Sequence, residues 1–364
     1  MHPHAGIHGG EFLQQRLHRH AGFDLELIIL TDLNATEEQI EQIVARVQEF
    51  GLEAEVARDG ARVIVEVSGP AEIARDQRLA TMAGVEAIIP ATTHYKLASL
   101  ERRGTASKVD ICGVSIGGDS AIALICGPCS VESREQMLAV ARRVKDAGAR
   151  VLRGGAFKPR TSPYSFQGLQ EDGLRILAEA RNETGLPVIT EIMDARDLPM
   201  VERYADCLQI GARNMHNFSL LKEVGRSHLP VLLKRGFSAT INELIMSAEY
   251  VLSGGQEHVL LCERGIRTFE TASRYTLDLT AVPILKAKTH LPVVVDPAHA
   301  VGLRQFVPQM ALAAIAAGAD AIMLEVHSEP DLARCDGEQS LVPDTLSKLF
   351  PRLRAVANAI GRDL

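Results

Sequence analysis

Residues 121–153, AIALICGPCSVESREQMLAVARRVKDAGARVLR, contain the pattern that decides the fold of most of this chain. An apolar strand, Ile122–Cys126, is followed by an amphipathic helix over Arg134–Ala147 and by a second apolar strand, Val151–Arg153. The same alternation recurs at intervals of roughly thirty residues, as repeated βα units require.

Six further strands are expected after this first unit, with helices such as Gly173–Thr184, Ile241–Leu252 and Val307–Ala317 between them. The expected strands are Val188–Glu191, Cys207–Ile210, Val231–Lys234, Val259–Cys262, Val293–Val295 and Ile322–Glu325. Eight strands with eight helices favour an α/β fold, a closed (β/α)₈ TIM barrel over residues 121–364. A doubly wound open sheet is the alternative, but it rarely needs eight repeats.

Residues 23–95 are expected to form a separate small α+β domain. The order of its elements is strand, helix, strand, strand, helix, strand, which is the ferredoxin-like arrangement. The ranges are Leu25–Leu30, a helix from the capping box at Thr36 to Gly51, Leu52–Ala57, Ala61–Val67, Ala71–Met82 and Val85–Ile89. Such a domain often serves regulation or assembly, and plain structural packing is an equally good interpretation. Residues 1–22 are expected as a flexible His-rich tail and residues 96–120 as a polar linker.

Composition narrows the class of protein. Hydrophobic residues make up 46% of the 364 residues and charged residues 23%, which is typical of a soluble globular protein. The net charge of -7 argues against a broad nucleic-acid surface. No apolar run reaches the roughly 18 residues of a membrane span, and no apolar signal peptide begins the chain. We therefore expect a cytoplasmic protein with neither nucleic acid nor membrane as partner. The six cysteines are dispersed, which argues against a disulfide framework.

Nearly every expected barrel strand is followed by a charged or metal-ligating residue. In chain order these are Cys129, Arg153, Glu191, Arg213, Lys234 with Arg235, Glu263 with Arg264, Asp296 with His299, and Glu325 with His327. One such residue would more often be a surface charge or a loop cap. The strand ends of a (β/α)₈ barrel meet at one rim. Charged or metal-ligating residues after all eight strands therefore predict an active site there.

Two chemistries are expected at this rim. The first is a cationic lining that calls for anionic groups such as phosphate or carboxylate, made of Arg153, Lys158, Arg160, Arg213, Lys234, Arg235 and Arg264. For Arg235, pairing with a neighbouring carboxylate is about equally well favoured. The second is a site for a divalent transition ion, made of Cys129, His299, Glu325 and Asp336, with His327 as a supporting or catalytic group. Motifs of P-loop nucleotide hydrolases, zinc proteases and α/β-hydrolases are absent.

The sequence motifs at these strand ends resemble those of 3-deoxy-D-arabino-heptulosonate 7-phosphate (DAHP) synthase. The resemblance is to the shorter type I branch, which shares a core with 3-deoxy-octulosonate 8-phosphate synthase. The front domain is similar to the ferredoxin-like regulatory unit of some members. The resemblance spans about residues 120–360 and rests on Gly127–Ser130, Leu152–Ser162, Ile210–Asn214, Leu233–Gly236, Cys262–Gly265, Asp296–His299 and Glu325–His327.

The resemblance implies a metal-dependent transferase at the first step of the shikimate pathway, in aromatic amino acid biosynthesis. It assigns Cys129, His299, Glu325 and Asp336 to a divalent ion of the Mn, Fe, Co or Zn class. It assigns Arg153, Lys158, Arg213, Lys234 and Arg264 to phosphoenolpyruvate, and Arg160, Thr161 and Ser162 to the aldose phosphate. Lys158, Asp296 and His299 are the catalytic candidates, with His299 chiefly a ligand and Lys158 a proton donor.

Several finer expectations follow from the resemblance. Pro159 stands where octulosonate enzymes usually have Asn, which favours erythrose 4-phosphate over arabinose 5-phosphate as the acceptor. A tyrosine or phenylalanine effector at the front domain and a homo-oligomer, with a tetramer favoured, are also implied. Cys126, His216 and Cys335 depart from the residues usual in the family at these positions. The thiols of Cys126 and Cys335 are expected near the ion. A non-catalytic sugar-phosphate sensor is the rival from another class.

Overall fold

The computed structural model describes residues 24–59, 62–70, 77–90, 95–159, 162 and 164–364. The chain divides into two compact units, with the boundary between Lys96 and Leu97. The expected tail, residues 1–22, lies outside the described residues. No helix in the described ranges is long and apolar enough to cross a membrane.

The front unit is a four-stranded antiparallel sheet with strand order β2-β3-β1-β4. Helix α2 begins at a capping box, in which Thr36 accepts from the backbone of Gln39, and it packs Ile43 and Val47 into the core of the unit. Its elements are β1 (Asp24–Thr31), α2 (Glu37–Glu49), β2 (Glu53–Asp59), β3 (Arg62–Pro70), α3 (Gln77–Ala80) and β4 (Val85–Pro90). The ferredoxin-like prediction is confirmed, although residues 71–76 of the expected second helix lie outside the described ranges.

The second unit is a closed barrel of eight parallel strands, which confirms the TIM-barrel prediction and excludes the open sheet. The last strand pairs with the first, from Ala321 opposite Ala123 to Glu325 opposite Gly127. The strands are β7 (Ala123–Gly127), β8 (Val151–Arg153), β9 (Val188–Ile192), β10 (Cys207–Ile210), β11 (Val231–Lys234), β12 (Val259–Glu263), β13 (Val293–Val295) and β14 (Ala321–Glu325).

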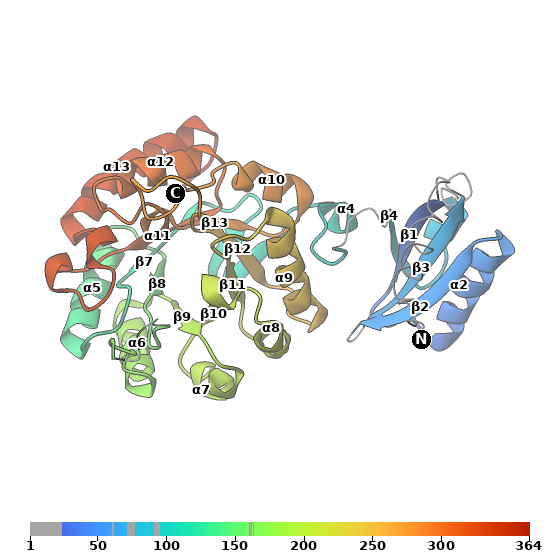
Figure 1. The fold of residues 1–364 in the computed structure, drawn as a ribbon, viewed down its shortest axis with the longest axis horizontal. Helices are drawn as coiled ribbons and strands as arrows, with labels where there is room; N and C mark the ends of the chain where they lie inside the picture. The colour runs from blue at the N-terminus through green and yellow to red at the C-terminus, as the bar shows by residue number, and fades with distance from the viewer. Residues whose placement is uncertain (1–23, 60–61, 71–76, 91–94, 160–161, 163) are drawn as a thin grey trace, which may run out of the picture. The chain divides into compact units, whose positions relative to one another are not determined.

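Helices surround the barrel (Figure 1), and the apolar stripe predicted for each long helix is buried against it. The four helices for which the sequence analysis gave bounds begin and end within two residues of the predicted positions. The surrounding helices are α5 (Arg134–Asp146), α6 (Glu171–Thr184), α7 (Leu198–Val201), α8 (Phe218–Val224), α9 (Ile241–Ser253), α10 (Ala281–Lys288), α11 (Pro297–Val301), α12 (Val307–Ala316) and α13 (Pro343–Ala359).

The segment expected as a polar linker, residues 96–120, differs from that expectation. It contains α4 (Leu100–Arg103) and a hairpin of β5 (Lys108–Ile111) and β6 (Val114–Gly117). Val109 and Ile111 are fully buried and belong to the same apolar cluster as side chains inside the barrel. The hairpin is therefore part of the barrel unit, and its apolar side chains close the barrel interior.

A buried histidine fixes the first residues of the barrel unit. The Glu249 carboxylate accepts hydrogen bonds from the amides of Leu97 (2.5 Å) and Ala98 (2.9 Å). His290 Nε2 donates to the Leu97 carbonyl at 2.8 Å, so its Nδ1 accepts from the Ser107 hydroxyl at 2.6 Å. Burial lowers the pKa of His290, with smaller effects from the nearby charges of Arg102, Arg103 and Glu257.

Candidate active site and metal centre

The predicted site residues converge at the carboxyl ends of the barrel strands. Cys129 follows β7, Arg153 ends β8, Lys234 ends β11, Asp296 follows β13 and Glu325 ends β14. A single cavity there is lined by predicted cations and by two of the four metal-ligand candidates. Its lining includes Arg153, Lys158, Pro159, Glu191, Arg213, Lys234, Arg264, His299, Cys335 and Asp336.

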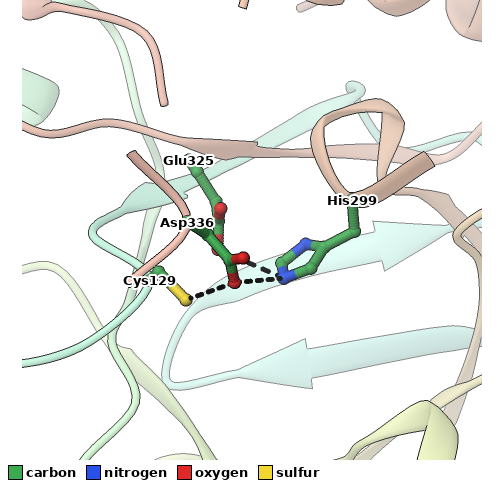
Figure 2. Close-up of side chains that lie close together, drawn as sticks. All are labelled: Cys129, His299, Glu325 and Asp336. Carbon is green, nitrogen blue, oxygen red and sulfur yellow. Dashed lines mark hydrogen bonds and ion pairs between the residues drawn. The ribbon is translucent and has the colours of Figure 1, made fainter. Parts of the chain in front are cut away.

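Four potential metal ligands point toward one another (Figure 2), and two of them, His299 and Asp336, line this cavity. One donor atom each from Cys129, His299, Glu325 and Asp336 lies within 4.8 Å of the other three. Cys129 Sγ is 3.1 Å from Asp336 Oδ2, and His299 Nε2 is 3.3 Å from Glu325 Oε1. Ligand bonds of about 2.0–2.3 Å place donors at such separations around one transition ion. The set therefore fits a divalent ion.

Further side chains orient two of these ligands. Asp296 Oδ2 lies 2.7 Å from His299 Nδ1, which favours the proton on Nδ1 and leaves Nε2 free to face the other ligands. The same Asp296 accepts the backbone amide of His299 and so begins α11. Glu325 receives hydrogen bonds from Gln339 at 2.5 Å and from Arg153 at 2.6 Å. Neither carboxylate is exposed.

The protonation of the ligand set is consistent with a cation site. Burial raises the pKa of Asp336, but the electrostatic effects of the neighbouring His299 and Arg274 outweigh burial and hold that pKa below its ordinary value. The contact with Cys335, followed by burial, raises the pKa of the Cys129 thiol well above its ordinary value. A thiol in this state keeps its proton until a cation replaces it, so ion binding here would release a proton.

The two additional thiols differ in position. Cys335 Sγ lies 3.2 Å from Cys129 Sγ, and Cys335 lines the cavity. Cys126 is fully buried, and burial raises the pKa of its thiol to about 12. His327 is outside the ligand set: its Nδ1 accepts from the Glu329 amide, and its Nε2 is 3.6 Å from Glu132.

Several cations of the mouth are paired with buried carboxylates. Lys234 Nζ lies 2.5 Å from Asp296, and Arg153 pairs with Glu325. Arg235 donates to Glu263 at 2.8 Å and to Asp278 at 2.7 Å, and it does not line the cavity. Of the two interpretations of Arg235, the ion pair is therefore the one that the structure favours.

Lys158 joins the cationic group to the metal-ligand group. Its Nζ lies 3.0 Å from Cys129 Sγ and 3.1 Å from the Cys129 carbonyl. Burial lowers the pKa of Lys158, but the neighbouring Cys129, Cys335 and Glu191 more than offset this effect. The net pKa lies above its ordinary value, so the amine stays charged.

Other predicted and unpredicted residues complete the site. Arg160 and Thr161 lie outside the described residues, and Ser162 is half-buried without lining the cavity. The structure adds residues to the lining that the sequence did not single out, namely Gln209, Phe237 and Arg274. Arg274 donates to Asp336 at 3.0 Å and to Gln339 at 2.8 Å. Its position in the long β12–α10 loop gave no periodic signal.

A closed parallel barrel whose mouth joins buried cations to a metal-ligand set is the architecture of an enzyme that acts on phosphorylated or carboxylated small molecules. Comparisons with known proteins agree with this class. Residues 86–360 match the DAHP synthetase I family, and residues 27–93 match the DAHP synthase ferredoxin-like domain. The chain belongs to the DAHP synthetase I family and carries the front domain of DAHP synthases.

One relative covers nearly the whole chain, and another covers about two thirds of it. The phospho-2-dehydro-3-deoxyheptonate aldolase of Thermotoga maritima is 43% identical over 92% of this chain and 99% of its own. A crystal structure of that enzyme superposes with a TM-score of 0.74 at 41% identity, covering 93% of this chain and 99% of that chain. The 2-dehydro-3-deoxyphosphooctonate aldolase of Syntrophotalea carbinolica is 33% identical over 68% of this chain and 94% of its own.

Proposed function

We propose that this protein condenses phosphoenolpyruvate with erythrose 4-phosphate to give DAHP and inorganic phosphate, with a divalent ion at the Cys129 centre. The observation that carries the proposal is the single cavity whose wall brings buried cations together with His299 and Asp336, two members of the cluster of four potential ligands. The first group fits the anionic groups of the substrates, and the second fits the ion that an aldehyde acceptor requires.

The residues divide the work by position. Arg153, Lys158, Arg213, Lys234 and Arg264 hold phosphoenolpyruvate by its phosphate and carboxylate. Cys129, His299, Glu325 and Asp336 hold the ion, which when bound supplies a Lewis acid for the aldehyde oxygen. The third carbon of phosphoenolpyruvate then attacks the aldehyde carbon. Water adds to the second carbon of phosphoenolpyruvate, and inorganic phosphate leaves from that carbon. The fixed positive charges stabilise the negative charge that develops.

Lys158 is the proposed proton donor to the new alkoxide. Its charged amine lies beside the ligand set, where the aldehyde oxygen would approach. Asp296 keeps the His299 ring in the tautomer that ligates and keeps Lys234 in place. His299 is thereby committed to the ion and serves as a ligand.

The acceptor is proposed from residues at the edge of the cavity. Pro159 lines it and offers neither a side-chain hydrogen-bond donor nor an amide N–H. An acceptor with one fewer hydroxyl suits this surface better than arabinose 5-phosphate. The 2-dehydro-3-deoxyphosphooctonate aldolases match only about two thirds of this chain, whereas a DAHP synthase front domain is matched as well. Both observations favour erythrose 4-phosphate.

The test is an assay of phosphate release from phosphoenolpyruvate with each aldose, with and without a chelator. Release with erythrose 4-phosphate that the chelator abolishes and added metal restores is the expected result. Cys129→Ala should retain the fold and lose turnover. Full activity of that variant without bound metal would refute the metal role. Phosphoenolpyruvate binding without phosphate release would favour the sensor.

For the front domain we propose feedback regulation by tyrosine or phenylalanine. The match of residues 27–93 to the ferredoxin-like domain of DAHP synthases supports it. Removal of residues 1–95 should leave catalysis and abolish inhibition; inhibition that survives the deletion rules the role out. The homo-oligomer, with a tetramer favoured, and the cytoplasmic location stay predictions.

A further inference from the structure

Arg264 differs from the other buried cations of the mouth in what surrounds it. Only 4% of the residue is exposed, and one terminal nitrogen, Nη1, is buried without a hydrogen-bond partner. Within the described ranges no carboxylate lies within ion-pair distance of it, whereas Arg153 and Lys234 each contact one. Burial lowers the pKa of Arg264, but a guanidinium remains charged at any physiological pH. Arg264 therefore presents at the cavity wall a charge that no carboxylate contacts directly, although the charge of Asp296 acts on it from a distance.

Two aromatic rings take the place of a carboxylate. Phe237 and Tyr275 are stacked, with ring centroids 5.3 Å apart and an angle of 6° between their planes. The guanidinium carbon of Arg264 lies 4.3 Å from the Tyr275 centroid and 4.9 Å from the Phe237 centroid. Arg213 lies 5.5 Å from the Phe237 ring. A ring face attracts a cation without adding a formal negative charge, so it holds an arginine while leaving its charge for a ligand.

The backbone holds both rings in place. The Phe237 carbonyl, just after β11, accepts a hydrogen bond from the Arg267 amide at 2.7 Å. The Tyr275 amide donates at 2.8 Å to Ala300 of α11, the helix that carries His299. Gly265 permits this approach: its φ is +90°, and a Cβ there would lie 2.8 Å from Tyr275 Cβ. The ring pair is thus fixed to the same frame as the ligand set.

We propose that Phe237 and Tyr275 are positioning residues that hold Arg264 in the geometry that binds an anionic group of phosphoenolpyruvate. Phe237 holds Arg213 in the same way. Phe237 also lines the cavity, and the role proposed for both rings is exerted through the arginines. Phosphoenolpyruvate as the anion rests on the proposed function, but the same geometry binds inorganic phosphate whatever the reaction. Preorganised cations lose less freedom on binding, so removal of a ring weakens anion binding.

The experiment compares Phe237→Leu, which keeps apolar volume without a ring face, with Phe237→Tyr, which restores the face. Both are measured as the metal-loaded full chain. We expect Phe237→Leu to raise the dissociation constant of inorganic phosphate and the KM for phosphoenolpyruvate by about 5- to 30-fold. This factor corresponds to the loss of a cation–π interaction of about 1–2 kcal/mol. The KM should change more than kcat does, and Phe237→Tyr should bind phosphate as wild type does.

Phe350→Leu is the matched control. Phe350 faces Arg354 on α13 at 4.8 Å, so the same chemical change is made at an arginine outside the cavity. Phosphate binding that is unchanged in Phe237→Leu, or equally weakened in Phe350→Leu, would overturn the inference. Tyr275→Leu replaces Phe237→Leu if the latter does not fold. Should the wild-type protein turn over neither aldose, the proposed function fails, and the phosphate constants alone decide the inference.

Discussion

Replacing Asp296 with Asn tests whether the metal centre depends on the side chain behind His299. Asp296 is completely buried, and its Oδ2 faces both Lys234 Nζ at 2.5 Å and His299 Nδ1 at 2.7 Å. An Asn can still cap α11 through its oxygen, but its NH₂ group then faces Nδ1. The imidazole is driven to the tautomer with the proton on Nε2, the nitrogen that faces Glu325 and Asp336.

The expected loss follows from this geometry. Disrupting a partner of a ligating histidine typically weakens metal binding by about 10- to 100-fold, which corresponds to about 1.4–2.7 kcal/mol. The dissociation constant is measured by calorimetric titration of the metal-free protein in a competing chelator. Loss of the carboxylate also leaves Lys234 without its buried partner, so thermal stability is recorded separately.

Asp278→Asn is the control for general destabilisation. Asp278 also pairs with a buried cation, Arg235, at 2.7 Å, but it makes no contact with His299. Its variant should lose stability and bind metal within about twofold of wild type. The reasoning is refuted if Asp296→Asn binds metal with wild-type affinity, or if the two variants weaken binding equally.

Two further predictions concern stability. Because burial lowers the pKa of His290, the unfolded chain binds a proton near pH 6 that the folded chain does not, so stability is lost as pH falls below about 6.5. The urea midpoint should therefore drop less between pH 7.5 and 5 in His290→Gln than in wild type; equal drops contradict this. Arg235→Met should cost about 3–5 kcal/mol because Glu263 is left buried and unpaired. Adding Glu263→Gln should restore much of the melting temperature, and a double variant no more stable than Arg235→Met would count against the ion pair.

The barrel and its mouth were readable from the sequence because one physical rule links them. Parallel strands buried on both faces are continuous apolar runs, so the first charged residue after each run marks the strand end. Residues such as Arg153, Lys234 and Glu325 stand at that point and do converge. The assignment of roles within the cluster goes beyond this rule, since it depends on side-chain directions that spacing does not contain.

Two features escaped prediction for different reasons. The hairpin within residues 96–120 had a readable signal, because Val109, Ile111, Val114 and Ile116 alternate with polar residues on either side of Cys112-Gly113. Its strands are only four residues long, and the polar residues on either side led to the prediction of a linker. The ring pair of Phe237 and Tyr275 had no such signal, since its members are 38 positions apart in two irregular loops and meet only in the folded barrel.

The pairing of β14 with β7 has a consequence for the order of assembly. Cys129 follows the first strand of the barrel, and Glu325 ends the last, so nearly two hundred residues must fold before these donors meet. A chain synthesised only as far as β13 lacks Glu325 and Asp336 and cannot bring all four donors together. An ion bound here would cross-link the first and last strands of the barrel, so the complete four-donor site forms only when the barrel closes and would stabilise the closed form.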